Sequence, residues 1–126
     1  MSTLLRLAAL SCFLWAVCLL VLKEQLVTAA ELTPVARALA NGLGLTQFIL
    51  IYLFWNAAKA PAENRPIIYA AIALMALKAA NDLYEILILL PPQEALASVL
   101  DLMVSVALLV GLLEALPRTL RQAAAT

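Results

Sequence analysis

The sequence contains no histidine and only two cysteines, Cys12 and Cys18. A zinc or haem site of the usual kind therefore lacks its ligands. The two cysteines are six residues apart on one predicted helix, which is a rotation of about 240°, so they cannot form a disulfide with each other. They also do not form the Cys-x-x-Cys pair of thiol–disulfide enzymes. We expect no cofactor, and we assign both cysteines to packing.

Charged residues are also scarce, at 13% of the 126 residues, and the eight basic and eight acidic side chains cancel. No basic cluster of the kind that nucleic acid or anionic lipid headgroups require is present, which excludes nucleic acid as a partner. In contrast, 66% of the residues are hydrophobic and the mean hydropathy is +1.02. This composition lies outside the range of soluble globular domains. It predicts a polytopic membrane protein whose surroundings are a lipid bilayer.

Four apolar stretches are each about as long as the hydrocarbon core of a bilayer requires. They cover residues of about 4–22, 36–58, 67–90 and 95–116. We therefore predict an all-α fold, in which four transmembrane helices form one antiparallel bundle and residues 1–126 form a single integral membrane domain.

Prolines and polar residues predict where these helices begin and end. Thr33-Pro34 and Pro66 suit helix starts, whereas Pro91-Pro92 and Pro117 are expected to end the third and fourth helices. Residues 23–37 mix charged and apolar side chains and predict a short interfacial segment between the first two helices. Because only residues 91–93 separate the last two spans, we expect these spans to form a tight hairpin.

The distribution of basic residues predicts the orientation of the bundle. Five lie on one predicted side of the membrane and two on the other, which places both termini in the cytoplasm of a bacterium and the chain in its inner membrane. The five are Arg6, Lys59, Arg65, Arg118 and Arg121, and the two are Lys23 and Arg37. Val27-Thr28-Ala29 also offers a signal-peptide cleavage site, an alternative that the absence of a soluble domain downstream disfavours.

The third predicted span carries a polar stripe. At about 100° per residue, its members Lys78, Asn81, Asp82 and Glu85 fall within one arc of about 100°. Each charge near the centre of a membrane helix costs roughly 2.5 to 3.5 kcal/mol, against a gain of about 0.3 to 0.6 kcal/mol for each leucine or isoleucine. These side chains must therefore face protein or water and not lipid.

The opposite face of the same span carries small residues, which allow a neighbouring helix to approach closely within lipid. Its members are Tyr69, Ala73, Ala76 and Ala80. We therefore expect this helix to contact partners on two sides.

A second polar stripe lies on the fourth predicted span, where Asp101 aligns with Glu94, Ser98 and Ser105. A hairpin folded at residues 92 and 93 places Asp101 level with Tyr84 and Glu85. We expect the two stripes to form one site in the outer half of the bundle, with Asn41 of the second span completing it. The predicted site residues are Lys78, Asn81, Asp82, Glu85, Asp101, Ser105 and Asn41.

This site sets three carboxyl groups against one buried cation, Lys78. Only one acid can then be well paired, so we expect at least one other to hold a proton. The leading hypothesis is a protein, not an enzyme in itself, that binds or conducts a small ligand, a proton or a cation. A metal held by the three acids is an alternative, but the lysine competes with it for their charge.

Two structural alternatives use the same residues. Lys78 and Asp82 are spaced to pair within their helix, and Asn81 and Ser105 can bridge helices, so that the stripes would only fix helix register. In the second alternative, the stripes serve an accessory subunit that docks a larger membrane partner or a second copy of the chain. The aromatic residues, Trp15 among them, include rings near span ends and are typical of anchors at the headgroup level.

The layout of one span, a short outer segment and three further spans resembles small bacterial inner-membrane proteins of the DoxX-like and BphX-like type. Thr33-Pro34, Asn64-Arg65-Pro66 and Lys78-Ala-Ala-Asn-Asp82 are the stretches that suggest it. The resemblance implies a four-helix membrane bundle and assigns no functional residue. Small multidrug transporters are similar in length and span number, but they place their working glutamate in the first span, which has no acidic residue here.

Overall fold

The part of the chain that the structure describes is built from helices alone. The computed structural model describes residues 1–22, 33–90 and 96–124. The helices are α1 (Ser2–Val17), α3 (Pro34–Ala57), α4 (Arg65–Tyr84) and α5 (Leu96–Ala124), and two π-helical turns, η1 (Cys18–Leu22) and η2 (Glu85–Leu89), extend α1 and α4. The prediction of an all-α chain with four helices is confirmed.

The predicted helix starts are confirmed at two prolines. Thr33 is the N-cap of α3, with its hydroxyl accepting a hydrogen bond from the Ala36 amide at 3.1 Å, and Pro34 occupies the first helical position. Pro66 similarly lies in the first turn of α4. Proline is favoured there because its missing N–H would have no partner within the helix.

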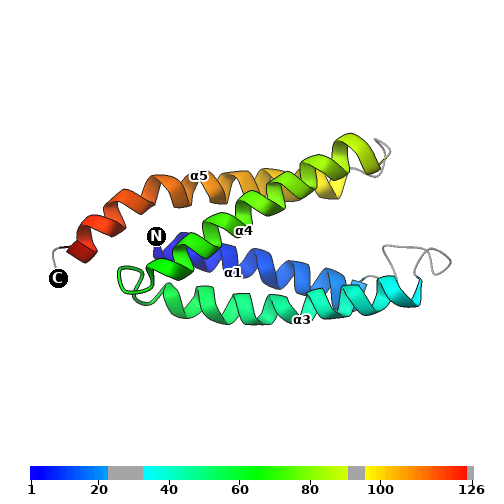
Figure 1. The fold of residues 1–126 in the computed structure, drawn as a ribbon, viewed down its shortest axis with the longest axis horizontal. Coiled ribbons are helices and arrows are strands. Elements are labelled where there is room, and N and C mark those ends of the chain that lie inside the picture. The colour runs from blue at the N-terminus through cyan, green and yellow to red at the C-terminus, as the bar shows by residue number, and fades with distance from the viewer. Residues whose placement is uncertain (23–32, 91–95, 125–126) are drawn as a thin grey trace.

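Two predicted boundaries were wrong. The helix does not stop at Pro117, because α5 continues through it to Ala124, and Figure 1 shows this helix bending in its C-terminal part. A proline removes one backbone hydrogen bond and bends a helix without necessarily ending it. Residues 34–37, predicted to be interfacial, form the first turn of α3. The rest of that segment, residues 23–32, and the predicted hairpin at 91–93 lie outside the described residues.

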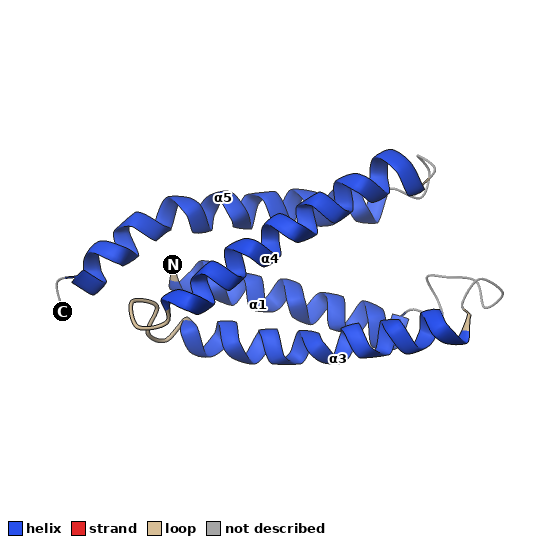
Figure 2. Ribbon diagram, in the orientation of Figure 1, coloured by secondary structure: helices blue, strands red, loops and turns tan. Residues whose placement is uncertain are grey.

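The helices pack as two pairs. Figures 1 and 2 show α1 beside α3 and α4 beside α5, which are also the two most extensive helix contacts, whereas the contact between α1 and α5 is much smaller. The Ser2 hydroxyl donates to the Ala58 carbonyl oxygen, so the start of α1 lies beside the end of α3. The side chain of Leu20 lies against Gly44, which places the end of α1 beside the first half of α3.

The apolar core occupies one end of this arrangement. Its buried residues come from the first half of α1, the end of α3, the first half of α4 and the second half of α5, and they include Leu5, Cys12, Phe54, Ile68, Met75 and Leu112. Cys12 is thus a packing residue, as predicted. The other end of the bundle holds few fully buried apolar side chains, and the polar residues of α4 and α5 lie there.

Three helices are long and apolar enough to cross a membrane: Ser2–Leu22, Pro34–Ala57 and Leu96–Gln122. The predicted span at 67–90 is not among them. Lys78, Asp82 and Glu85 interrupt its apolar sequence, so the side chains that set this helix apart are those of the predicted site.

Substitution of Gly44 should destabilise the fold more than substitution of the nearby Gly42. A Cβ atom added to Gly44 would lie 2.6 Å from Cγ of Leu20, whereas one added to Gly42 would meet no described atom within 4 Å. We expect Gly44→Leu to lower the free energy of unfolding by about 1–3 kcal/mol through overpacking. Thermal unfolding of the detergent-solubilised protein, followed by circular dichroism, measures this.

Gly42→Leu is the matched control and should unfold as the parent does. Equal destabilisation by both substitutions would contradict the close approach of α1 and α3 at Gly44.

Candidate functional site

An ion pair between α4 and α5 lies at the centre of the polar region. The Lys78 ammonium is 3.0 Å from Oδ2 of Asp101, and it donates a hydrogen bond of 3.2 Å to Oδ1. The two side chains retain only 18% and 16% of their exposure. Both carboxylate oxygens of Asp101 therefore face the same cation.

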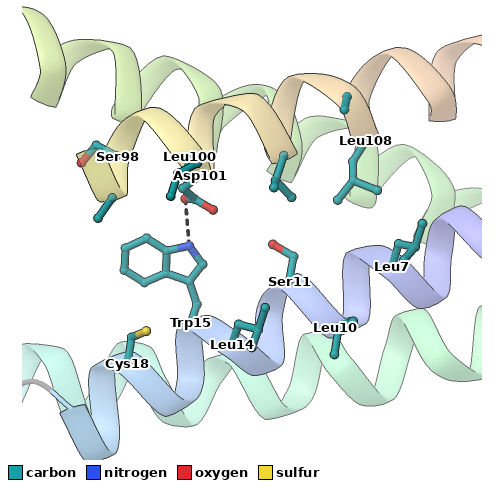
Figure 3. Close-up of a pocket in the computed structure, with 13 residues that line it drawn as sticks. Leu7, Leu10, Ser11, Leu14, Trp15, Cys18, Ser98, Leu100, Asp101 and Leu108 are labelled. Atoms are coloured by element: carbon teal, nitrogen blue, oxygen red, sulfur yellow. Dashed lines mark hydrogen bonds between the residues drawn. The ribbon is translucent and has the colours of Figure 1, made fainter. Parts of the chain in front are cut away.

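Trp15 connects this ion pair to α1. Its indole N–H donates to Oδ2 of Asp101 at 2.8 Å, as Figure 3 shows, and the Lys78 ammonium lies 4.6 Å from the centre of its ring. The indole thus stabilises the carboxylate through its edge and the ammonium through its face. Three helices, α1, α4 and α5, meet at this one group of side chains.

Glu85 is held in a second hydrogen-bonded group, at the first residue of η2. Asn81, one turn earlier, donates to Oε1 at 2.8 Å, and Ser98 of α5 donates to Oε2 at 2.9 Å. Neither donor is charged, so Glu85 has hydrogen bonds but, within the described residues, no direct ion-pair partner. This group forms a second polar connection between the two helices.

Asp82 lies between these two groups and is the most enclosed of the acids. Only 3% of its surface is exposed, and its Oδ2 has no hydrogen-bond partner. It lies within electrostatic range of Asp101, Lys78 and Glu85. Ser105 of α5 is completely buried, and its hydroxyl also lacks a partner. Buried polar atoms are usually satisfied, so these two require an explanation.

An open groove of about 580 Å³ runs between α1 and α5 and reaches the ion pair. Figure 3 shows apolar side chains of both helices along it, with Trp15, Asp101 and Ser98 toward one end and the hydroxyl of Ser11 farther along. The groove lies between the two helix pairs, where α1 and α5 make few contacts. Its volume is within the usual range for small-molecule sites.

The structure brings together six of the seven predicted site residues. Lys78, Asn81, Asp82 and Glu85 of α4 and Asp101 and Ser105 of α5 lie in one region. Asn41 is on the exposed surface of α3, whereas the polar region is built from α1, α4 and α5. Its part in the site stays a prediction, because helical periodicity gives the face of a residue on its own helix, not the neighbour of that face.

Two predicted pairings also differ from the structure. Lys78 pairs with Asp101 of the neighbouring helix and not with Asp82 of its own. Asp101 was expected level with Glu85, but Ser98 takes that place. The four-carbon stem of a lysine lets its ammonium reach a partner about one turn from its own level.

Trp15 and Ser98 were not among the predicted site residues. Ser98 was recognised only as part of the stripe of Asp101. Trp15 was grouped with headgroup anchors, although it is seven residues from Leu22, the end of the combined α1–η1 helix. That distance of about two turns was the available signal, because a tryptophan inside a span needs a partner for its N–H.

The side chains of this region are of kinds that can form hydrogen bonds and exchange protons. Within the described ranges, no group of three or more histidine, cysteine, aspartate or glutamate side chains could hold a metal ion. The groups available are one ammonium, three carboxyl groups, one carboxamide, two hydroxyls and an indole. Comparisons with protein-family models, curated proteins and solved structures find no match for this chain.

The contribution of the Lys78–Asp101 pair to the free energy of unfolding can be tested by substitution. Lys78→Met should lower the free energy of unfolding by about 3–5 kcal/mol, because it leaves Asp101 without its cation in an enclosed place. The double variant Lys78→Met, Asp101→Leu should recover most of this loss, because it also removes the unpaired carboxylate. Unfolding of the solubilised protein by increasing amounts of a denaturing detergent measures both.

Lys59→Met is the control, because Lys59 is exposed and only donates to Asn56 at 2.9 Å. It should change stability by about 0.5 kcal/mol or less. Additive effects of the Lys78 and Asp101 substitutions would contradict a direct pair.

Proposed function

We propose that this chain is an integral membrane protein of four antiparallel membrane-spanning helices, and that its polar cluster is a proton-linked binding site for a small ligand or cation. The polar cluster comprises Trp15, Lys78, Asn81, Asp82, Glu85, Ser98, Asp101 and Ser105. The protein binds or conducts its ligand, and it is not an enzyme in itself.

The distribution of exposed side chains supports the membrane assignment. Large apolar residues are exposed on all four helices, among them Leu14, Val35, Leu87 and Val110, and Leu87 exposes 72% of its surface. In water such extensive apolar surface would cause association. In a bilayer it is the surface that contacts the lipid chains. The contact between the start of α1 and the end of α3 agrees with successive helices that cross in opposite directions.

With the basic residues on the cytoplasmic side, the bundle lies in a bacterial inner membrane with both termini inside. The polar cluster then lies in the outer half, away from the core residues Leu5, Phe54 and Leu112. This arrangement agrees with the layout of the DoxX-like and BphX-like proteins, which supports the architecture only.

Asp82 is the observation that carries the assignment of a proton-linked site. An ionised carboxylate that is 3% exposed, with one oxygen unpaired and two other acids nearby, would cost several kcal/mol. Lys78 offsets this charge only in part, because its ammonium already pairs with Asp101. We therefore assign a proton to Asp82 in the unoccupied site. A bound cation would replace that proton, which links binding to pH.

The groups around Asp82 set the sign of this linkage. They are Asp101 of α5, Lys78 and Glu85 of its own helix, and the thiol of Cys12 on α1 near the ion pair. The three acids outnumber the single ammonium. Loss of the Asp82 proton makes the site more negative, so cation binding should strengthen as the pH rises.

A second candidate function is docking of a larger membrane partner or a second copy of the chain. One observation favours it: the small-residue face of α4, at Tyr69, Ala73, Ala76 and Ala80, is exposed. In the described part of the chain, the contacts expected on the second side of α4 are not made. A partner on that face would leave the polar cluster on the other side free to bind its ligand.

Infrared difference spectroscopy during a pH titration tests the assignment. In the parent, lowering the pH should bring up the carbonyl band of an enclosed, protonated carboxylic acid, and this band should be absent in Asp82→Asn. The reason is that an amide has no carboxyl proton to lose. The variant should also lose the pH dependence of cation binding in liposomes.

Glu114→Gln is the control, because Glu114 is exposed on α5, and its band pattern should match the parent. A parent without the band, or an Asp82→Asn variant that retains it, would refute the proton assignment. Glu85→Gln should retain the band and weaken cation binding.

A further inference from the structure

The groove between α1 and α5 has a polar end and an apolar length. Asp101, Ser98 and the indole of Trp15 lie at the polar end, as Figure 3 shows. Leucines and other apolar side chains line the remainder: Leu7, Leu10, Leu14, Leu100 and Val104. These five are each exposed by between 45% and 58%. The groove therefore opens onto the apolar surface, which faces lipid in the proposed arrangement.

Of the residues that line the groove, Asp101 is the charged one, and its carboxylate is paired with Lys78. Asp101 lines the groove directly, and Ser98 joins the groove to Glu85. Lys78 is not among the lining residues, and its ammonium lies against the ring of Trp15. A ligand head at this end thus meets the Asp101 carboxylate, the Ser98 hydroxyl and the Trp15 ring, and a second cation would share the carboxylate with Lys78.

We propose that the groove binds an organic cation with an apolar body, taken up laterally from the lipid phase. This proposal rests on the proposed function and names the class of its ligand. The cationic head lies beside Asp101, Ser98 and Trp15, and the apolar body follows α1 and α5 toward Leu7. A volume of about 580 Å³ accommodates a body of drug size.

The second observation that points to a ligand is Ser11. Its side chain lines the apolar length of the groove and is only 6% exposed, and Figure 3 shows its hydroxyl directed toward α5. An enclosed hydroxyl at this depth offers a hydrogen bond to a ligand that carries a second polar group along its body. A purely apolar groove for lipid chains would not need it.

Quenching of Trp15 fluorescence by brominated amphiphiles tests the proposal. The Trp55→Phe variant is used, because the sequence contains two tryptophans and this leaves Trp15 alone. The protein is placed in nanodiscs, and three dodecyl probes that carry a bromine on a carbon close to the head group are titrated, with trimethylammonium, hydroxyl and sulfonate heads. Half-maximal quenching should require a roughly tenfold lower concentration of the ammonium probe in the membrane than of the alcohol. This corresponds to a difference of about 1.4 kcal/mol in binding free energy.

Filling the groove should abolish this preference. Val104 lines the groove and Val106 does not, yet both are exposed on α5. Val104→Phe should reduce quenching by the ammonium probe to that of the alcohol, whereas Val106→Phe should behave as the parent. Ala107→Leu fills the same groove and serves if Val104→Phe does not fold.

Equal quenching by the three probes, or equal effects of Val104→Phe and Val106→Phe, would overturn the ligand class. The infrared band of Asp82 separates this failure from a failure of the proposed function. If the band is present and pH-dependent while the probes are not distinguished, the proton-linked site stands and the organic cation is excluded. If the band is absent, both proposals fall.

Discussion

The pair between Lys78 and Asp101 is the interaction on which the rest of this arrangement depends. In an apolar helix neither charge is tolerable alone, so each requires the other helix to be in place. The 3.0 Å contact therefore fixes both the separation and the register of α4 and α5. Through the indole of Trp15, which binds both members of the pair, it also fixes α1. One pair of opposite charges thus specifies how three of the four helices meet.

The fold divides its stabilisation between two ends. One end has a closely packed apolar core, in which small residues such as Ala8, Ala57 and Ala71 let the helices approach. The other end has few buried apolar contacts and relies on hydrogen bonds and charge. The polar end suits a binding site, because side chains held by hydrogen bonds can exchange partners when a ligand binds. Close-packed side chains in the apolar core cannot rearrange in this way. The groove opens where the apolar packing between α1 and α5 is weakest.

The length of the apolar stretches predicted the four helices, helical periodicity predicted the two polar stripes, and the placement of proline predicted the starts at Pro34 and Pro66. All three are local properties of the sequence. What it could not supply was contact between helices: Asn41 lies on the exposed surface of α3, and Ser98 donates to Glu85 where Asp101 was expected. The role of Trp15 was missed because an aromatic ring near a span end resembles an anchor, and its partner on α5 is distant in sequence. The continuation of α5 through Pro117 depended on tertiary context that a local rule does not include.

The π-helical turn η2 has a separate consequence for how this chain can vary. A π-turn contains about one residue more than an α-turn, so the side chains beyond it are rotated relative to those before it. In η2 the Leu90 amide donates to the Glu85 carbonyl oxygen at 2.9 Å. Glu85 itself lies on the same helix face as Asn81, which donates to its side chain. All the polar groups of α4 therefore precede the extra residue. Loss or gain of a residue between 86 and 89 would leave every one of them in its present direction, so related chains of unequal length can share one geometry of charges.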